Sequence, residues 1–181
     1  PCPLLGFAAF SGTGKTTLLL ELVPRLKDAG LRLAVVKHAH HTFDMDHPGK
    51  DSYRLRSAGA DEILVAGRCR MAWIRECNDN RVEPSLHEAL AVLDPARLDL
   101  VLVEGFKHEA IPKIELHRTA LGRPLLFPDD DKVIAIATDG GALAHDPGQL
   151  PRLSINDPEQ IVAFVLDFAG RAAQATPNLA C

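Results

Sequence analysis

The sequence shows no excess of positive charge. Its 181 residues include 20 Lys and Arg against 24 Asp and Glu, which gives a formal net charge of −4. A chain without an overall basic field has no general attraction for nucleic acid or for an anionic membrane surface. We therefore expect no nucleic-acid partner and no membrane partner.

Long apolar runs and the marks of export are also missing. No segment reaches the length needed to span a membrane, and the amino-terminal residues lack the basic region and cleavage pattern of a secretory signal. The cysteines include no C-x-x-C pair, and in reducing cytosol the thiol is the default state. We expect a cytoplasmic protein in which Cys2, Cys69, Cys77 and Cys181 have a structural role or none.

Internal repeats and low-complexity segments are absent, so the sequence has to be understood as an ordinary globular one. Hydrophobic residues make up 46% and charged residues 24% of it, which excludes extended disorder as a general description. The length allows one domain with a full core, whereas two independent domains would both be small. We expect a single domain over residues 1–170 and a flexible tail over residues 171–181.

What the chain does contain is a Gly-rich run, A-F-S-G-T-G-K-T-T, at residues 9–17. It lies between an apolar segment at residues 4–8 and three leucines, so it joins a predicted strand to a predicted helix. This is the setting of a phosphate-binding loop, in which Gly12 and Gly14 let backbone N–H groups approach a triphosphate. The alternative is a Gly-rich turn with an exposed lysine.

Each side chain of this loop has an expected task. Lys15 would neutralise the β and γ phosphates, and the Thr16 hydroxyl would complete the shell of a Mg²⁺ ion. Thr17 is placed to reach the α phosphate, and Thr13 belongs to the same cradle. Ala9 stands where the motif usually has its first glycine, and an alanine fits there if its φ stays negative.

The rest of the sequence alternates short apolar runs with amphipathic stretches, the pattern of a parallel sheet with crossover helices. We predict an α/β fold of the P-loop NTPase type, with a mostly parallel sheet flanked by helices and a β-hairpin extension. Strands are expected at residues 4–8, 31–37, 63–66, 70–76, 98–103, 113–118 and 133–137, and helices at residues 16–29, 51–58, 158–168 and after Ser85. The hairpin would join the third and fourth strands through Gly67 and Arg68.

The apolar strand predicted at residues 98–103 is followed by a carboxylate, Glu104. The carboxyl ends of parallel strands face the ligand crevice, so Glu104 is expected near the metal of the phosphate loop, bound to it directly or through water. The alternative is a solvated charge at a strand end. Gly105, the next residue, would let the backbone approach the γ phosphate.

A polar stretch at residues 38–50 is too long for a tight turn and is a candidate functional loop. Asp46 could bind the water shell of the magnesium ion or position an attacking water, and Lys50 could meet a phosphate. Three histidines beside two aspartates raise a zinc alternative, but no fixed ligand spacing is present. We favour a nucleotide-sensing loop, with Asp46 as the candidate catalytic and metal-binding residue.

Nothing in the sequence matches Asn-Lys-x-Asp, the common guanine-reading tetrapeptide. The comparably placed acid is Asp139, just after the strand predicted at residues 133–137. Its carboxylate could accept hydrogen bonds from N1 and N2 of guanine. A capped turn is the alternative, and the residues alone do not decide between the two.

Taken in order, five segments resemble the MobB family of molybdopterin-guanine dinucleotide biosynthesis proteins. They are SGTGKTTLL, VVKHAHHTFDMDHPGKDSYRLRSAGADEILVAG, LVLVEGFK, KIELHR and AIATD, and the resemblance extends over residues 4–170. The lysine-histidine loop leading to residues 48–52 is the most distinctive, because a large superfamily shares the phosphate loop. By family motif, residues 12–17 match the triphosphate loop, Glu104 the second nucleotide motif and Asp46 the acid of the first variable loop.

The resemblance implies an adapter that binds GTP and Mg²⁺, with at most slow GTP hydrolysis. It would assist the guanylyltransferase that joins GMP to molybdenum-bound molybdopterin, with apo-molybdoenzymes as further candidate partners. The family is usually homodimeric with an extended sheet, and the strand that contains Trp73 is a reasonable place for the contact. The rival function is a small-molecule kinase, which normally needs an arginine-bearing lid. Arg54 and Arg56 could supply charge, but they fall in a short predicted helix.

Overall fold

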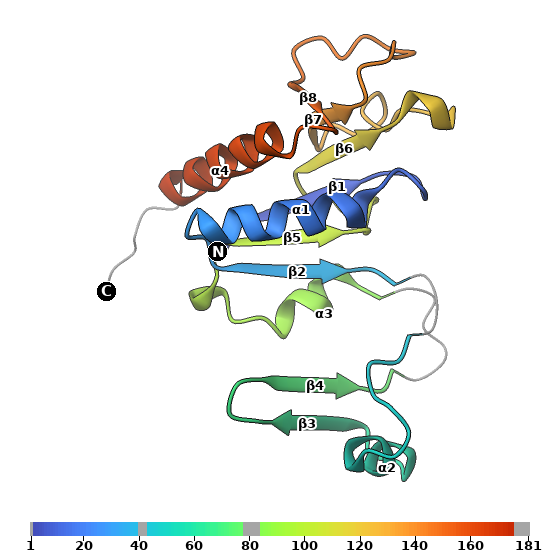
Figure 1. Cartoon of the computed structure of the whole chain (residues 1–181), viewed down its shortest axis with the longest axis vertical. Coiled ribbons are helices and arrows are strands. Elements are labelled where there is room, and N and C mark those ends of the chain that lie inside the picture. Colours follow the sequence, from blue (N-terminus) through green and yellow to red (C-terminus); the bar gives the residue numbers. More distant parts are fainter. Residues whose placement is uncertain (1, 40–42, 78–83, 176–181) are drawn as a thin grey trace. The chain divides into compact units, whose positions relative to one another are not determined.

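The structure is a computed structural model, and it describes residues 2–39, 43–77 and 84–175. The chain divides into two compact units, one made of Pro1–His38 with Leu86–Cys181 and the other of Ala39–Ser85. Each unit has its own secondary structure (Figure 1). In sequence, the second unit is therefore an insertion between two stretches of the first.

A six-stranded sheet forms the centre of the first unit, with the strand order β2-β5-β1-β6-β7-β8. Every pair of neighbouring strands in it is parallel. The strands are β1 (Leu4–Ala8), β2 (Leu33–Lys37), β5 (Leu100–Glu104), β6 (Lys113–His117), β7 (Val133–Thr138) and β8 (Arg152–Ser154). Because all six run the same way, their carboxyl ends lie along one edge of the sheet, and the loops that follow them meet there.

Helices cover both faces of this sheet. α1 (Lys15–Asp28) and α4 (Pro158–Ala175) pack on one face, in the core that contains Leu100 and Leu102 of β5. α3 (Leu86–Ala91) packs on the other face, in the core that contains the alternate residues Val101 and Val103. Figure 1 shows α1 running along β1 and β5. The predicted α/β fold, a mostly parallel sheet flanked by helices, is confirmed.

Two elements of the first unit differ from the sequence prediction. β8 has no counterpart in it, because a strand of three residues that follows a proline carries too little alternation to be recognised. α4 ends at Ala175 rather than at Phe168. Its predicted cap is confirmed, because the Gln160 N–H donates a 3.3 Å hydrogen bond to Asp157 Oδ1. Residues 176–181 of the predicted tail lie outside the described residues.

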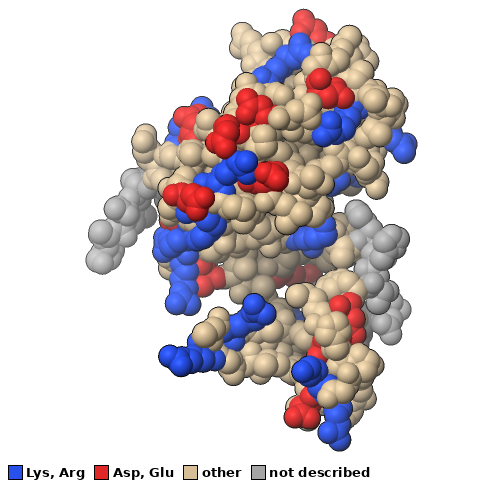
Figure 2. Space-filling view, in the orientation of Figure 1, with Lys and Arg blue, Asp and Glu red and all other residues tan. Residues whose placement is uncertain are grey.

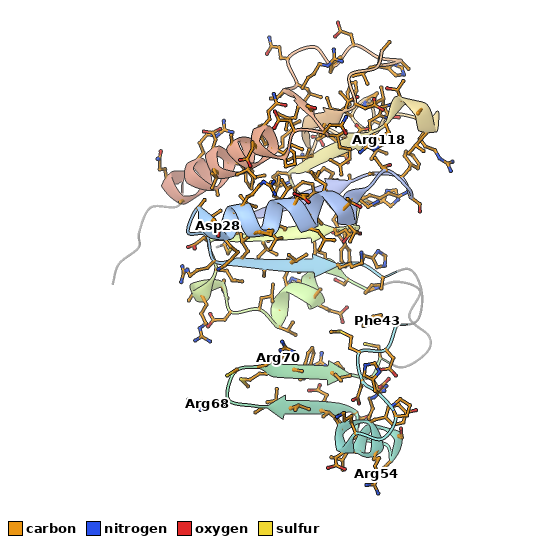
Figure 3. The ribbon with its side chains drawn as sticks, viewed as in Figure 1. Asp28, Phe43, Arg54, Arg68, Arg70 and Arg118 are labelled. Atoms are coloured by element: carbon orange, nitrogen blue, oxygen red, sulfur yellow. The ribbon has the colours of Figure 1, made fainter. Side chains whose placement is uncertain are left out.

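The second unit contains a helix and the predicted β-hairpin. α2 (Asp51–Ser57) is followed by β3 (Glu62–Ala66) and β4 (Met71–Arg75), which pair antiparallel. The turn differs from the prediction: Ala66 pairs with Met71, and the Gly67 N–H donates a 2.9 Å hydrogen bond to the Arg70 carbonyl. The two turn residues are thus Arg68 and Cys69 rather than Gly67 and Arg68, and Figure 3 labels Arg68 in the turn and Arg70 just after it.

The surface carries both signs of charge. Figure 2 shows Lys and Arg side chains interspersed with Asp and Glu side chains on the face that it draws. No large patch of a single sign is visible on that face, which agrees with the small net charge. Among the residues that the structure describes, no helix combines the length and the apolar composition needed to cross a membrane.

Candidate functional site

The Gly-rich run forms a tight loop between β1 and α1. Gly12 has a φ of 84° and Gly14 a φ of 97°, values that favour glycine over any other residue. Gly14 is the N-cap residue of α1. The buried Thr13 closes the loop, because its hydroxyl donates a 2.8 Å hydrogen bond to the Phe10 carbonyl. The backbone N–H groups at the start of α1 therefore point toward the space enclosed by the loop.

Ala9 meets the condition set by the sequence. Within the described ranges, Phe106 is the only residue other than glycine with a positive φ, so the backbone at Ala9 does not need a glycine. The carbonyl of Ala9 accepts a 3.0 Å hydrogen bond from Nζ of Lys15, which also lies 3.4 Å from the Phe10 carbonyl. The ammonium group of Lys15 thus lies across the loop from its own backbone, against the residues that begin the loop.

Lys15 lies in a partly desolvated position. Burial lowers the pKa of its ammonium group below the ordinary value, the charge of Glu104 opposes this shift, and Lys37 and Lys107 add to it. The same surroundings make a phosphate a favourable partner, because its charge would offset the three clustered ammonium groups.

On the β5 side of the loop, oxygen atoms converge as a magnesium site requires. The Thr16 hydroxyl donates a 2.7 Å hydrogen bond to Oε1 of Glu104. Nζ of Lys37 lies 2.8 Å from Oε2 of Glu104 and 3.3 Å from the Thr16 hydroxyl. Burial raises the pKa of Glu104, but the hydrogen bonds from Lys37 and Thr16 outweigh it, so the net shift is downward and the carboxylate stays charged. A hydroxyl beside a carboxylate is a donor set that fits Mg²⁺.

Position 105 requires a glycine because its backbone lies close to the side chain of His38. The φ of Gly105 is 88°, and a Cβ placed on it would lie 2.7 Å from Cβ of His38. The next residue, Phe106, has a φ of 49° and stacks its ring on that of His38 at 4.8 Å. The chain therefore turns sharply after β5, and the expected approach of the Gly105 backbone to a γ phosphate stays a prediction.

On the other side of the loop, Asp139 follows β7. Its Oδ1 accepts hydrogen bonds from the backbone N–H of Thr119 at 3.3 Å and from the Thr119 hydroxyl at 2.8 Å, which lower the pKa of the carboxyl below its ordinary value. This is the geometry of the capped-turn alternative. The reading of guanine by Asp139 stays a prediction.

Several basic side chains near the phosphate loop were not predicted from the sequence. Arg118, which follows β6 at the place marked in Figure 3, donates from Nε to the Thr13 carbonyl at 3.1 Å and from Nη1 to Oδ1 of Asn156 at 3.3 Å. Lys107 and Arg123 lie 5.4 and 5.9 Å from the centre of the Phe10 ring. The argument used for Glu104, a charged residue directly after a parallel strand, would have found Arg118 as well.

The second unit holds the other two predicted site residues. Asp46 is 8% exposed, and its Oδ1 accepts hydrogen bonds from the Ser52 hydroxyl at 2.9 Å and the His47 N–H at 3.2 Å. Nε of Arg56 lies 3.6 Å from Oδ2 of Asp46. Lys50 is exposed and is the N-cap residue of α2.

The structure therefore brings Lys15, Thr16 and Glu104 together in the first unit, while Asp46 and Lys50 belong to the second. For the zinc alternative, the described residues contain no group of three or more His, Cys, Asp or Glu side chains that could hold a metal. His40 and His41, which that alternative would use, lie outside the described residues.

Comparison with known proteins assigns the family. Residues 4–139 match the family model described as MobB, molybdopterin guanine dinucleotide synthesis protein B. The chain belongs to the MobB family. The molybdopterin-guanine dinucleotide biosynthesis adapter protein of Escherichia coli (strain K12) is 48% identical over 167 residues, which cover 92% of this chain and 93% of that protein. A crystal structure of Bacillus subtilis MobB, 26% identical, covers 91% of this chain and 96% of its own with a TM-score of 0.68.

A second relative extends the likeness across species. The molybdopterin-guanine dinucleotide biosynthesis adapter protein of Haemophilus influenzae (strain ATCC 51907 / DSM 11121 / KW20 / Rd) is 42% identical over 166 residues, covering 90% of this chain and 87% of that protein. The match to both MobB adapters spans both units, because it covers almost the whole of each chain.

Proposed function

We propose that the chain is a GTP-binding adapter of molybdenum cofactor biosynthesis that assists the formation of molybdopterin-guanine dinucleotide. The observation that carries the nucleotide part is the contact of Thr16 with Glu104 beside Lys15, which places a carboxylate where it could bind the metal of a phosphate loop. The adapter part is supported by the 48% identity to a named adapter protein over nearly the whole chain. The main output is association with partners, and GTP hydrolysis is weak.

Within this proposal the loop residues hold the triphosphate, and Thr16 and Glu104 hold Mg²⁺. The ion would screen the phosphate charges when bound. Gly105 approaches the γ phosphate and Asp139 accepts from the guanine base. The second unit would supply the nucleotide-sensing loop, in which Asp46 would bind the water shell of the ion or position an attacking water and Lys50 would contact a phosphate.

The proposed partners are the molybdenum cofactor guanylyltransferase, apo-molybdoenzymes and a second copy of the chain, in the cytoplasm. The homodimer would use the apolar face of the β3–β4 hairpin. Leu64 and Trp73 are cross-strand partners there, and the side chains of Leu64, Met71 and Trp73 are 59%, 66% and 39% exposed. A face with such large apolar side chains favours burial against another protein surface.

The alternative function is a small-molecule kinase. The contacts of the arginines in α2 argue against this function. Both Nη atoms of Arg56 are occupied, one by Glu76 at 2.8 Å and the other by Asp44 at 2.9 Å, and these bonds raise the pKa of the guanidinium further. Arg54 is paired more loosely with Asp51 at 3.6 Å. A guanidinium held by two carboxylates of its own unit is poorly suited to close over phosphates.

Calorimetry tests the proposal directly. GTP, GDP and ATP are titrated into the protein with and without Mg²⁺, and the guanylyltransferase is then added to the loaded protein. We expect Mg²⁺-dependent GTP binding, tighter binding of the partner to the loaded form and turnover below about 1 s⁻¹, since kinases typically run at 1 to 100 s⁻¹. Lys15→Ala should abolish nucleotide binding. Rapid phosphoryl transfer to a small molecule, or no nucleotide binding by the unaltered protein, would overturn the proposal.

A further inference from the structure

Two consecutive residues after β6 connect three loops at the carboxyl edge of the sheet. Arg118 holds the carbonyl of Thr13 in the phosphate loop and the side chain of Asn156, which follows β8. Thr119 holds Asp139, which follows β7, through both its N–H and its hydroxyl. The loops after β1, β7 and β8 are thus fixed to one another through the end of β6.

The position of these loops indicates which part of a nucleotide they would face. The metal-side pair Glu104 and Lys37 belongs to β5 and β2, on one side of β1. Arg118 and Asn156 follow β6 and β8, on the other side of β1. If the triphosphate lies on the loop after β1 with its metal toward β5, the nucleoside would extend over the ends of β6, β7 and β8.

The chemistry of arginine determines how the Asn156 amide is turned. A guanidinium is donor-only, so the atom of Asn156 that faces it is the acceptor Oδ1. The amide nitrogen, with its two N–H donors, therefore faces away from Arg118. Asn156 is exposed, whereas Thr13 at the other end of the same guanidinium is buried. The amide donors are thus on an exposed residue at the carboxyl edge of the sheet, where they are accessible to a ligand.

We propose that Asn156, oriented by Arg118, reads the 6-position of the purine and so selects 6-oxopurines over 6-aminopurines. Guanine and hypoxanthine present an acceptor, O6, at this position, which matches the N–H donors of Asn156. Adenine presents an amino donor at the 6-position, which opposes them. The inference rests on the proposed GTP-binding function and supplies a base reader for a chain that lacks Asn-Lys-x-Asp.

The backbone around Asn156 is held in place before any ligand binds. The Asn156 N–H donates to the Ser154 hydroxyl at 3.3 Å, and the Ser154 N–H donates to Oε1 of Gln160 in the first turns of α4. The loop is thus tied to both the strand before it and the helix after it. Asn156 therefore needs little ordering when a base arrives, which favours discrimination.

The test compares the base preference of Asn156→Asp with that of the unaltered protein. GTP, ITP, ATP and inorganic tripolyphosphate are titrated in the presence of Mg²⁺. Aspartate keeps the acceptor for Arg118 but loses the donors, so GTP and ITP should bind at least about tenfold more weakly, while ATP does not weaken. Tripolyphosphate, which has no base, should bind equally to both proteins. Gln160→Glu is the matched control, because it adds the same charge to the start of α4 and keeps an acceptor for Ser154.

Arg118→Lys tests the positioning role. A lysine is a single point of attachment and cannot hold the Thr13 carbonyl and Asn156 together, so the GTP-to-ATP affinity ratio should fall by about tenfold while tripolyphosphate binding persists. The melting temperature shows whether Arg118→Lys is folded. If it is not folded, the result for Asn156→Asp alone decides the test.

Three outcomes would overturn the inference. One is an unchanged GTP-to-ATP ratio in Asn156→Asp, and another is an equal loss of that ratio in Gln160→Glu. The third is equal affinity of the unaltered protein for ITP and ATP. The proposed function survives each of these as long as GTP binds, and it fails separately if the unaltered protein binds no nucleoside triphosphate.

Discussion

The hydroxyl of Thr16 donates a 2.7 Å hydrogen bond to Oε1 of Glu104, although 88 residues separate them in the chain. The contact exists because β1 and β5 are parallel neighbours, with Phe7 paired to Glu104, so the residues that follow β1 pass the last residue of β5. It joins the start of α1 to the end of a fully buried strand. The geometry of the metal-side residues is thus set by strand pairing rather than by the loop alone.

Replacing Glu104 with glutamine should uncouple nucleotide binding from magnesium. The glutamine side chain would keep an oxygen acceptor for Thr16 but lose the negative charge, and loss of such a group typically lowers metal affinity by about 10- to 100-fold. We expect GTP affinity in Mg²⁺ to fall toward the value measured with chelator, as seen by calorimetry. Glu159→Gln, at an exposed ion pair with Arg25, is the control. Undiminished magnesium dependence would contradict the assignment of Glu104.

Restoring the motif glycine at position 9 should not improve the site. Because Ala9 has no positive φ, Ala9→Gly is expected to change the GTP dissociation constant by less than about twofold and to lower stability by about 0.5–1 kcal/mol through chain entropy. Gly12→Ala is the contrasting variant, because its φ of 84° strains an alanine even though the space beside it is open. A large gain of affinity in Ala9→Gly would show that Ala9 limits the loop.

Asp46→Ala tests whether the second unit senses the nucleotide. If Asp46 contacts the magnesium shell or the attacking water, Mg²⁺-dependent GTP binding or turnover should fall, by about tenfold or more. Stability should also fall, by about 1–3 kcal/mol, because Arg56 loses a neighbouring carboxylate. Ser52→Ala separates the effects, since it removes a hydrogen bond to Asp46 but keeps the charge. Unchanged binding and turnover in Asp46→Ala would leave it a purely structural residue.

The ion pair of Arg32 with Asp99 predicts a pH dependence of stability. Hydrogen bonds from the Arg32 side chain and backbone lower the pKa of Asp99 from 3.8 to about 2. Because the folded-state pKa is depressed, the contribution is complete above pH 3.8 and is lost as the pH falls through about 2. Both side chains are substantially exposed, which limits the contribution to about 1 kcal/mol.

Asp99→Asn should therefore be less stable than the unaltered protein at pH 7, and the difference should shrink below pH 3.8 and vanish below about pH 2. Urea unfolding at a series of pH values measures it. Asp131→Asn, at an exposed pair with Lys132, should show no comparable difference. A difference that persists at the lowest pH would assign the effect to packing rather than to charge.

Leu64→Arg should weaken the proposed homodimer. A guanidinium on the apolar face of the β3–β4 hairpin would have to be desolvated next to a second copy, so the dimer dissociation constant should rise by about 100-fold or more. Sedimentation equilibrium measures it. Leu20→Arg is the matched control, because Leu20 lies on α1 and is 70% exposed. An unchanged dimer in Leu64→Arg would place the contact elsewhere.

Local patterns in the sequence were sufficient to predict most of the fold. The apolar runs that became β1, β5, β6 and β7 are long enough to show their character, and their boundaries differ by at most a few residues. β8 has only three residues and was missed. The hairpin turn is displaced by one residue because register depends on which cross-strand pairs form, here Ala66 with Met71, and a weak turn signal does not specify it.

The proximity of Lys15, Thr16 and Glu104 was predictable, because these residues come from one motif or lie at the end of a long strand. Asn156 was missed because it follows β8, and a strand absent from the prediction cannot place the residue after it. Its contact with Arg118 also depends on the strand order β6-β7-β8. Long-range pairing carries this information, and a single sequence does not display it.

The position of Lys37 has a consequence for how the proposed site would take up a magnesium ion. Its ammonium group lies against both the Glu104 carboxylate and the Thr16 hydroxyl, the two groups that a magnesium ion would use. In the proposed function, an arriving Mg²⁺ ion would have to displace this ammonium group from Glu104 and Thr16. Loading of the proposed magnesium site would therefore begin with the departure of Lys37 from Glu104.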